Sequence, residues 1–406
     1  RSEVKDRHNT HVSTKAVVSS VRQETKTSRR KSVDYRFARR VRAKGRQPRV
    51  AANIVVSPTL EANTLFIGGD RSVIVFAREW SVRLLCCAEH ICVDGTFRSA
   101  PVTHSQVLTF HVLCKNGSSF PVVHALLTDK RRSSYAKVLD AIQRYSNRRR
   151  IGVVFARKNL KVTTDYESAL MKAFKDAGAK IHGCHFHLCQ AIWRFVHTHG
   201  LSQRYFTDGD FRSSVRALMA VPFLKTRDIR RHFLELKESV DDADLALVYD
   251  YFERTWIDGF GAELISQYNE LFRTNNNAEA FHSSLRHVFF RAHPQFGEFV
   301  GKIIGVMETA EAEYEAERLR PKQIDRRLQS SYKNIKNVVD NFYHDSSLGL
   351  PLPKLLERIG DILHGDVRFE ERYEQGDEAT FEPVGDEFCT NGVPMEIADE
   401  RVKIHS

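Results

Sequence analysis

The order of secondary-structure patterns along residues 64–197 limits the fold of this chain more than any other feature of its sequence. Apolar runs typical of strands cover residues 91–97, 107–114 and 120–127. The turn-forming sequence Lys115-Asn116-Gly117 joins the last two. Three consecutive strands with short links predict an antiparallel meander.

Helix and strand patterns alternate after the meander. The expected elements, in chain order, are strands at 65–67 and 73–76, a helix at 79–90, the three strands of the meander, a helix at 134–145, a strand at 161–164, a helix at 167–177, a strand at 180–184 and a helix through 193–197. From the meander onward the order is βββαβαβα. It predicts an α/β fold of the ribonuclease H-like type, a mixed sheet with helices on both faces.

A helix-rich stretch without a comparable strand pattern follows over residues 202–273. Asn275-Asn276-Asn277 then supplies N-cap chemistry for a helix over 278–291. We therefore expect an all-helical insertion that interrupts the core. The expected divisions are a basic arm (1–55), the first part of the core (56–200), the helical insertion (201–273), the completion of the core (274–320), a helical C-terminal extension (321–365) and an acidic flexible tail (366–406).

Positive charge is concentrated at the start of the chain. The 406 residues carry a formal net charge of +11, and residues 1–50 alone hold 16 Lys and Arg against 4 Asp and Glu. This stretch has no sustained periodicity, so we expect a disordered arm that binds polyanions such as DNA. Arg39, Arg40 and Arg42 are candidate DNA contacts, and the same cluster is typical of a nuclear import signal. A solvated tail without such a role is the alternative.

Cysteine usage and hydropathy restrict the compartment. Seven cysteines in 406 residues are an odd, sparse set that fits a reducing compartment. With the basic arm, this favours the nucleus. No apolar run reaches the roughly 18–20 residues of a bilayer span, so no membrane partner is expected. The chain begins Arg1-Ser2-Glu3 without a Met, which indicates a fragment or a processed chain.

Three acidic residues stand near strand ends or at a helix start, and each has a plain structural alternative. Asp94 lies in the apolar run 91–97. Asp-Gly favours a hairpin turn there, whereas a strand would bury the carboxylate, which is costly without a cation or partner. Asp165 follows the strand at 161–164, where it fits either a helix N-cap or a site at a strand end.

Glu279 belongs to the expected helix at 278–291. At 100° per residue it shares one side with His282 and Arg286, opposite the apolar stripe. A solvent-facing helical Glu is the plain interpretation. The alternative is that this polar side lines one wall of a cleft that faces the sheet.

Five separated motifs together resemble the Mutator-like element (MULE) transposase domain over roughly residues 60–292. They are Val93-Asp94-Gly95-Thr96-Phe97; Phe120-Pro121 with Ala125-Leu126-Leu127 and Tyr135; Thr164-Asp165-Tyr166-Glu167 with Ala169; Gly183-Cys184-His185-Phe186-His187 with Gln190-Ala191; and Asn275-Asn276 with Glu279, His282 and Leu285. Their order and context make the resemblance more specific than any single motif.

The resemblance implies a ribonuclease H-like core with a DDE triad of Asp94, Asp165 and Glu279, interrupted by a helical insertion before the Glu. It implies that these residues hold two Mg²⁺ or Mn²⁺ ions for DNA cleavage and strand transfer. The implied partners are terminal inverted repeats and target DNA. A homodimer or larger assembly is expected because two transposon ends must be held together. His282 and Arg286 are candidates for contacting the scissile phosphate.

The CxxH motif of the same family maps onto Cys184 and His187. We expect a structural or DNA-contacting role for it beside the active site. Zinc binding is the alternative, although no second pair completes four ligands. Trp193 and Trp256 are candidates for stacking on an unpaired base, and core packing is their alternative.

Two rival functions remain open from the sequence. One is a domesticated, non-catalytic DNA-binding protein derived from a transposase. The other is a nuclease that cleaves RNA–DNA hybrids on the same scaffold, which the long helical stretch disfavours.

Overall fold

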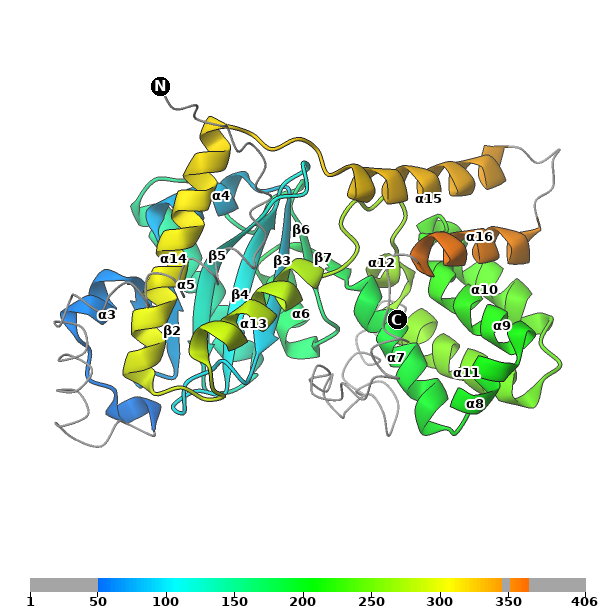
Figure 1. The fold of residues 1–406 in the computed structure, drawn as a ribbon, viewed down its shortest axis with the longest axis horizontal. Helices are drawn as coiled ribbons and strands as arrows, with labels where there is room; N and C mark the ends of the chain where they lie inside the picture. The colour runs from blue at the N-terminus through cyan, green and yellow to red at the C-terminus, as the bar shows by residue number, and fades with distance from the viewer. Residues whose placement is uncertain (1–49, 345–350, 365–406) are drawn as a thin grey trace, which may run out of the picture.

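The computed structural model describes residues 50–344 and 351–364, and a seven-stranded sheet forms its centre (Figure 1). The strands are β1 (Thr64–Ile67), β2 (Val73–Phe76), β3 (His90–Thr96), β4 (Gln106–Leu113), β5 (Ser119–Leu127), β6 (Lys161–Thr164) and β7 (Lys180–Gly183), in the spatial order β1-β2-β5-β4-β3-β6-β7. Pairing is antiparallel from β1 to β3, whereas β3, β6 and β7 run parallel. The predicted meander and the α/β class with a mixed sheet are confirmed.

Alternate side chains of the strands face two separate apolar cores. On β2, Val73 and Val75 belong to one core, and Ile74 and Phe76 belong to the other. The first core is covered by α4 (Glu79–Cys87), α5 (Arg132–Arg148) and α6 (Ser168–Asp176), and the second by α3 (Pro58–Ala62), α13 (Asn276–Phe289) and α14 (Phe296–Leu319). Because both faces are covered, all eight residues of β4 are buried.

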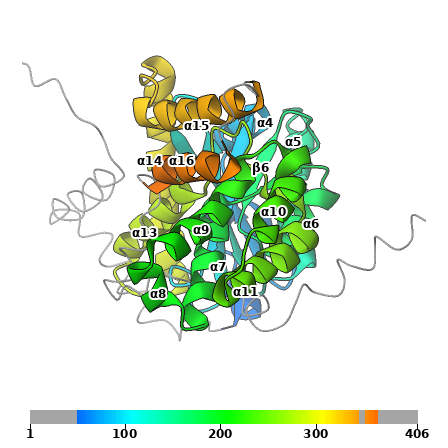
Figure 2. The same cartoon turned by 90° about the vertical axis from the view of Figure 1, so that its right-hand side faces the viewer.

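A second body of the chain is helical and has its own core (Figure 2). Its elements are α7 (His185–Thr198), α8 (Ser202–Thr207), α9 (Gly209–Ala220), η3 (Val221–Phe223), η4 (Thr226–Asp228), α10 (Ile229–Glu238), α11 (Ala243–Phe252), the π-helix η5 (Glu253–Phe260) and α12 (Ala262–Ile265). We call these elements the helical unit. They lie between β7 and α13 in the sequence, and no strand occurs among them.

The last described helices return to the helical unit. The segment after α14 contacts the β4–β5 turn, where the backbone N–H of Asp325 donates to the carbonyl of Asn116 at 2.9 Å. Then α15 (Arg326–His344) places Ile335 and Val339 in the core of the helical unit, and α16 (Leu352–His364) packs against α9. In Figure 1, the connection after α14 crosses along the top from the sheet, and α15 lies above the helical unit.

Several helix ends differ from the sequence prediction. The helix expected at 79–90 stops at Cys87, because His90 already belongs to β3. The helix expected at 278–291 begins at Asn276 and ends at Phe289, where Phe290 turns into the left-handed region. A short 3₁₀ turn, η2 (Ala51–Asn53), precedes α3. Within the described ranges, no helix is long and apolar enough to cross a membrane.

Candidate active site

Two carboxylates occupy adjacent positions near the C-terminal ends of neighbouring parallel strands. In the register of β3 and β6, Val93 pairs with Thr164, so the residues that follow are Asp94 and Asp165. Ligand and catalytic sites of open α/β sheets gather at this carboxyl edge of the parallel strands. The pair is therefore the natural starting point for a candidate active site.

Asp94 is not in a hairpin turn, and Asp165 is not the N-cap of α6. β3 continues through Gly95 to Thr96, so Asp94 stands within a strand and not in a turn. The N-cap residue of α6 is Glu167, so Asp165 lies two residues before the cap. Its Oδ1 instead accepts the backbone N–H of Glu167 at 3.3 Å, which closes the turn between strand and helix.

The two aspartates have opposite pKa shifts. Burial, followed by the negative charges of Asp94 and Glu167, raises the pKa of Asp165 to about 8. Burial also acts to raise the pKa of Asp94, but the hydrogen bond and charge of His282, with the charge of His187, hold it below the ordinary value of 3.8. At neutral pH, Asp94 is therefore ionised while Asp165 keeps its proton.

His282 is the partner that keeps Asp94 charged. Its Nδ1 lies 3.2 Å from Oδ2 of Asp94, and its side chain is 6% exposed. The helical wheel grouped His282 with the polar side of its helix, but α13 packs over β3 and β4, so the buried arc of the helix extends to His282. Glu279 lies at the border of this arc, with its side chain 29% exposed, and so is not fully solvent-facing.

Glu279 reaches the same region from the first turn of α13. Its Oε1 lies 3.8 Å from Nε2 of His187, the histidine of the CxxH motif. Burial raises the pKa of the Cys92 thiol, and the charges of Asp94 and Glu279 add to that rise. Because Cys92 stands two residues before Asp94 on β3, this shared influence ties Glu279 to the strand that bears the first aspartate.

Cys184, at the start of α7, forms hydrogen bonds with the residue at the start of α13. Its Sγ–H donates to Oδ1 of Asn275 at 3.0 Å, and the backbone N–H of Asn275 lies 3.4 Å from the same sulfur. Next to them, the N–H of His185 donates to the carbonyl of Arg273 at 2.8 Å. Cys184 and Asn275 are each 0% exposed, so the thiol acts inside the protein and not at a surface open to DNA.

A group beside Asp165 was not singled out from the sequence. Glu167 accepts a hydrogen bond from the Tyr135 hydroxyl at 2.5 Å, and Tyr135 in turn accepts one from Gln106 at 2.9 Å. The ammonium of Lys130 lies 3.5 Å from Glu167. Tyr135 and Glu167 both belong to the resembling motifs, and this was the sequence signal that could have identified them.

The remaining expected DNA contacts have different outcomes. Trp256 and Trp193 are each 2% exposed; their rings pack on Tyr166 and Tyr205, so core packing describes both. Arg286 is partly buried on α13, one turn beyond His282. The expected contacts of the basic arm, Arg39, Arg40 and Arg42, lie outside the described residues.

The donor set fits a divalent cation by its chemistry, although no ligand cage is formed. In the part of the chain that the structure describes, no group of three or more His, Cys, Asp or Glu side chains is arranged to hold a metal ion. Asp94 is engaged by His282, and Glu279 faces His187. Carboxylate oxygens are nevertheless the donors that Mg²⁺ and Mn²⁺ prefer, and a cation would relieve the repulsion that raises the pKa of Asp165.

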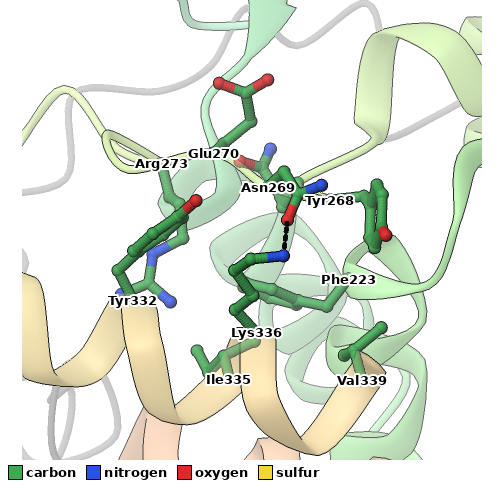
Figure 3. A pocket seen from close by; sticks show the side chains of 10 residues that line it. Phe223, Tyr268, Asn269, Glu270, Arg273, Tyr332, Ile335, Lys336 and Val339 are labelled. Carbon is green, nitrogen blue, oxygen red and sulfur yellow. Dashed lines mark hydrogen bonds between the residues drawn. The ribbon is translucent and has the colours of Figure 1, made fainter. Parts of the chain in front are cut away.

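A separate pocket lies at the other end of β6, where the segment before α13 meets α15 (Figure 3). Its empty volume is about 270 Å³. The side chains that line it are Phe223, Gln267, Tyr268, Asn269, Glu270, Arg273, Tyr332, Ile335, Lys336 and Val339. Glu270 pairs with Lys161 at the start of β6, whereas Asp165 follows its end, so this pocket is distinct from the aspartate pair.

The middle of the chain is similar to a known protein domain. Residues 90–191 match the family model described as the MULE transposase domain. No curated protein matches the chain. The matched segment begins at the first residue of β3 and ends within α7, so it contains Asp94, Asp165 and the CxxH motif, while Glu279 lies beyond it. Residues 90–191 are therefore similar to the MULE transposase domain, and this match suggests a transposase-related function.

Proposed function

We propose that this chain is a DDE-type DNA transposase whose catalytic carboxylates are Asp94, Asp165 and Glu279. The observation that carries the proposal is the placement of Asp94 and Asp165 at adjacent positions near the C-terminal ends of two paired parallel strands inside the matched domain. Glu279 supports it, because the preceding residue of α13, Ala278, packs against Cys92, which stands two residues before Asp94.

The strand order supports a ribonuclease H-like core as part of this proposal. The antiparallel unit β5-β4-β3 is continued by β6 and β7, both parallel to β3, and β1 and β2 extend the opposite side. The helical unit then stands as an insertion between the second aspartate and the helix of Glu279. In this division, the core resumes at α13.

The chemistry divides between the cations and the protein. When bound by the three carboxylates, two Mg²⁺ ions would supply a nucleophile at neutral pH and stabilise the leaving oxygen. His282 fixes the orientation of Asp94 through the 3.2 Å contact. Asp165 carries a proton at neutral pH in the protein alone, so binding of positive charge here is coupled to release of that proton.

Nicking of DNA tests the proposal directly. The substrate is a supercoiled plasmid that carries the terminal inverted repeats of the element encoding the chain. We expect nicking that requires Mg²⁺ or Mn²⁺, stops in EDTA, and falls about 1,000-fold or more in Asp94→Asn. Asp140→Asn is the matched control, because this carboxylate is exposed on α5 and pairs only with Arg144 at 2.8 Å among the contacts described. Undiminished nicking by Asp94→Asn contradicts the proposal.

A second function is favoured by one observation. Asp94 and Glu279 each face a histidine, and no three-ligand group is formed among the described residues. This arrangement suits a domesticated DNA-binding protein that has kept the fold without cleavage. Salt-dependent binding to the repeats, with no nicking in either metal, selects that alternative.

A further inference from the structure

An exposed aromatic ring stands at the end of α13. Phe290 is 69% exposed, and it is the C-cap residue, with φ 59° and ψ −9°. Helices that end in this left-handed conformation usually place glycine there, because a Cβ makes it strained. A bulky, exposed side chain at such a position is unfavourable for the fold itself, which directs attention to what the ring contacts in function.

The backbone around Phe290 is firmly held. His293 has a second positive φ, 49°, within the same 290–295 loop. Its N–H donates to the carbonyl of Arg98 at 2.8 Å, and the carbonyl of Pro294 accepts from the N–H of Val102 at 3.1 Å. The loop is therefore tied to the β3–β4 connection by hydrogen bonds at Arg98 and at Val102, and it is not a frayed helix end.

These bonds also locate the loop relative to the acids. Arg98 follows Asp94 by four residues, and β3 ends at Thr96. The β3–β4 and α13–α14 connections both lie at the lower end of the sheet in Figure 1, opposite the end where α15 begins. The 290–295 loop thus lies at the end of the sheet where β3 ends, which is the carboxyl edge near the aspartate pair.

Positive charge surrounds the ring. The Lys302 ammonium lies 5.0 Å from the ring centroid of Phe290, and Arg98 and Arg291 are exposed on the two connections. Glu298 is the acid that pairs with both Arg291 and Lys302. An aromatic ring among cations matches a strand with unpaired bases, because a base stacks on the ring while the cations meet its phosphates.

We propose that the 290–295 loop binds single-stranded DNA next to the cleavage site, with Phe290 stacked on an unpaired base and Arg98 on a phosphate. The inference rests on the proposed function, since it assumes that DNA reaches the aspartate edge. A nucleic acid fits better than a protein partner, because the cations Arg98, Arg291 and Lys302 outnumber the acid Glu298 that pairs with two of them.

Fluorescence anisotropy with labelled 20-nucleotide oligo-dT and a labelled 20-base-pair duplex tests the inference. The variant is Phe290→Gly, since glycine adopts the left-handed conformation without strain and so keeps the loop. We expect oligo-dT affinity to fall about fivefold or more, and duplex affinity to change less than about twofold. The control is Leu319→Ala, which removes an equally exposed apolar side chain (75%) at the far end of α14 and should leave both affinities unchanged.

The outcomes separate this inference from the proposed function. Oligo-dT affinity unchanged in Phe290→Gly, with its thermal midpoint not lowered, overturns the inference even if the plasmid is nicked. An equal loss on oligo-dT and duplex overturns it as well, because stacking requires an unpaired base. Binding that depends on Phe290 in a chain that nicks nothing refutes only the proposed function.

Discussion

Replacing Gly183 by alanine tests how tightly the second aspartate is bound to the helical unit. Gly183 is the last residue of β7, and a Cβ there would lie far inside contact distance of three atoms of the Tyr166 ring. Tyr166 directly follows Asp165 and is 2% exposed. Its ring also meets Trp256 and Phe260 of η5, at centroid distances of 4.7 and 4.8 Å. The ring has no direction in which to yield without moving the backbone beside Asp165 or the π-helix.

The expected cost follows from this enclosure. Adding a methyl group to a well-packed core typically destabilises a protein by about 1–3 kcal/mol. Because the Tyr166 ring is held between two aromatic side chains, we expect Gly183→Ala to lower the free energy of unfolding by about 3 kcal/mol, at the upper end of this range. The Tyr166 hydroxyl is buried without a hydrogen-bond partner and is one of the three close atoms. Tyr166→Phe should therefore stabilise the protein by about 1 kcal/mol and lower the cost of the alanine to about 2 kcal/mol.

Urea unfolding of the wild type, both single variants and the double variant measures these terms. Gly301→Ala is the control with the opposite sign, because a Cβ added to this exposed glycine of α14 would meet, among the described residues, no atom within 4 Å beyond its chain neighbours and its own helix backbone. It should stabilise the protein by about 0.5–1 kcal/mol. A Gly183→Ala variant within about 0.5 kcal/mol of wild type, or an equal cost in both Tyr166 and Phe backgrounds, would refute the reasoning.

Three further predictions concern buried polar groups. Burial and neighbouring carboxylates raise the pKa of Asp165 to about 8. The stability that protonated Asp165 contributes is therefore fully present below the pKa of the unfolded chain, near 3.8, and is lost as the pH rises through 8. Urea midpoints of the metal-free chain should fall over this pH range, and Asp165→Asn should reduce the fall. Cys184→Ala should lower the free energy of unfolding by about 1–2 kcal/mol, because the buried side-chain carbonyl of Asn275 loses the thiol that donates to it. Cys184→Ser keeps a donor and should lower it less. Equal shifts of the thermal midpoint in the two variants would contradict this role of the thiol. Lys161→Met should lower the free energy of unfolding by about 2 kcal/mol, because the Glu270 carboxylate, 8% exposed, loses the ammonium 2.6 Å away. In urea unfolding, the double variant Lys161→Met with Glu270→Leu should recover most of this loss. A double variant as unstable as Lys161→Met would show that the ion pair is not the cause.

Local sequence patterns were sufficient to predict the strands of the sheet. The run at 161–164 matches β6 residue for residue, because the three β-branched residues Val162, Thr163 and Thr164 favour a strand and the short stretch between Asn159 and Asp165 leaves a helix no room. The meander followed from short links that only antiparallel strands can accept. These features depend on neighbours in sequence, so periodicity and turn chemistry report them.

Contacts between distant segments were not accessible in the same way. His282 was grouped with the polar side of its helix, yet it is buried against Asp94, because the sheet surface under α13 carries a carboxylate where a helical wheel assumes an apolar neighbour. Cys184 was expected to have a structural or DNA-contacting role beside the active site; the structure gives it a structural contact, with Asn275, which is 91 residues away in sequence. In both cases the deciding polar partner lies on another element, and composition and spacing give no sign of it.

The contacts around the aspartate edge give the helical unit a role in placing the acids. Tyr166 packs against the π-helix on one side and against β7 on the other, and it is joined directly to Asp165. Cys184 and Asn275 fasten the return from the helical unit to the start of the helix that bears Glu279. Packed aromatic contacts and buried hydrogen bonds have few alternative arrangements, so movement of the helical unit must either carry both acids or break these contacts. A DNA strand that binds the helical unit would therefore act on the geometry of Asp165 and Glu279 together, while Asp94, held by the central strand β3 and by His282, keeps its position in the sheet.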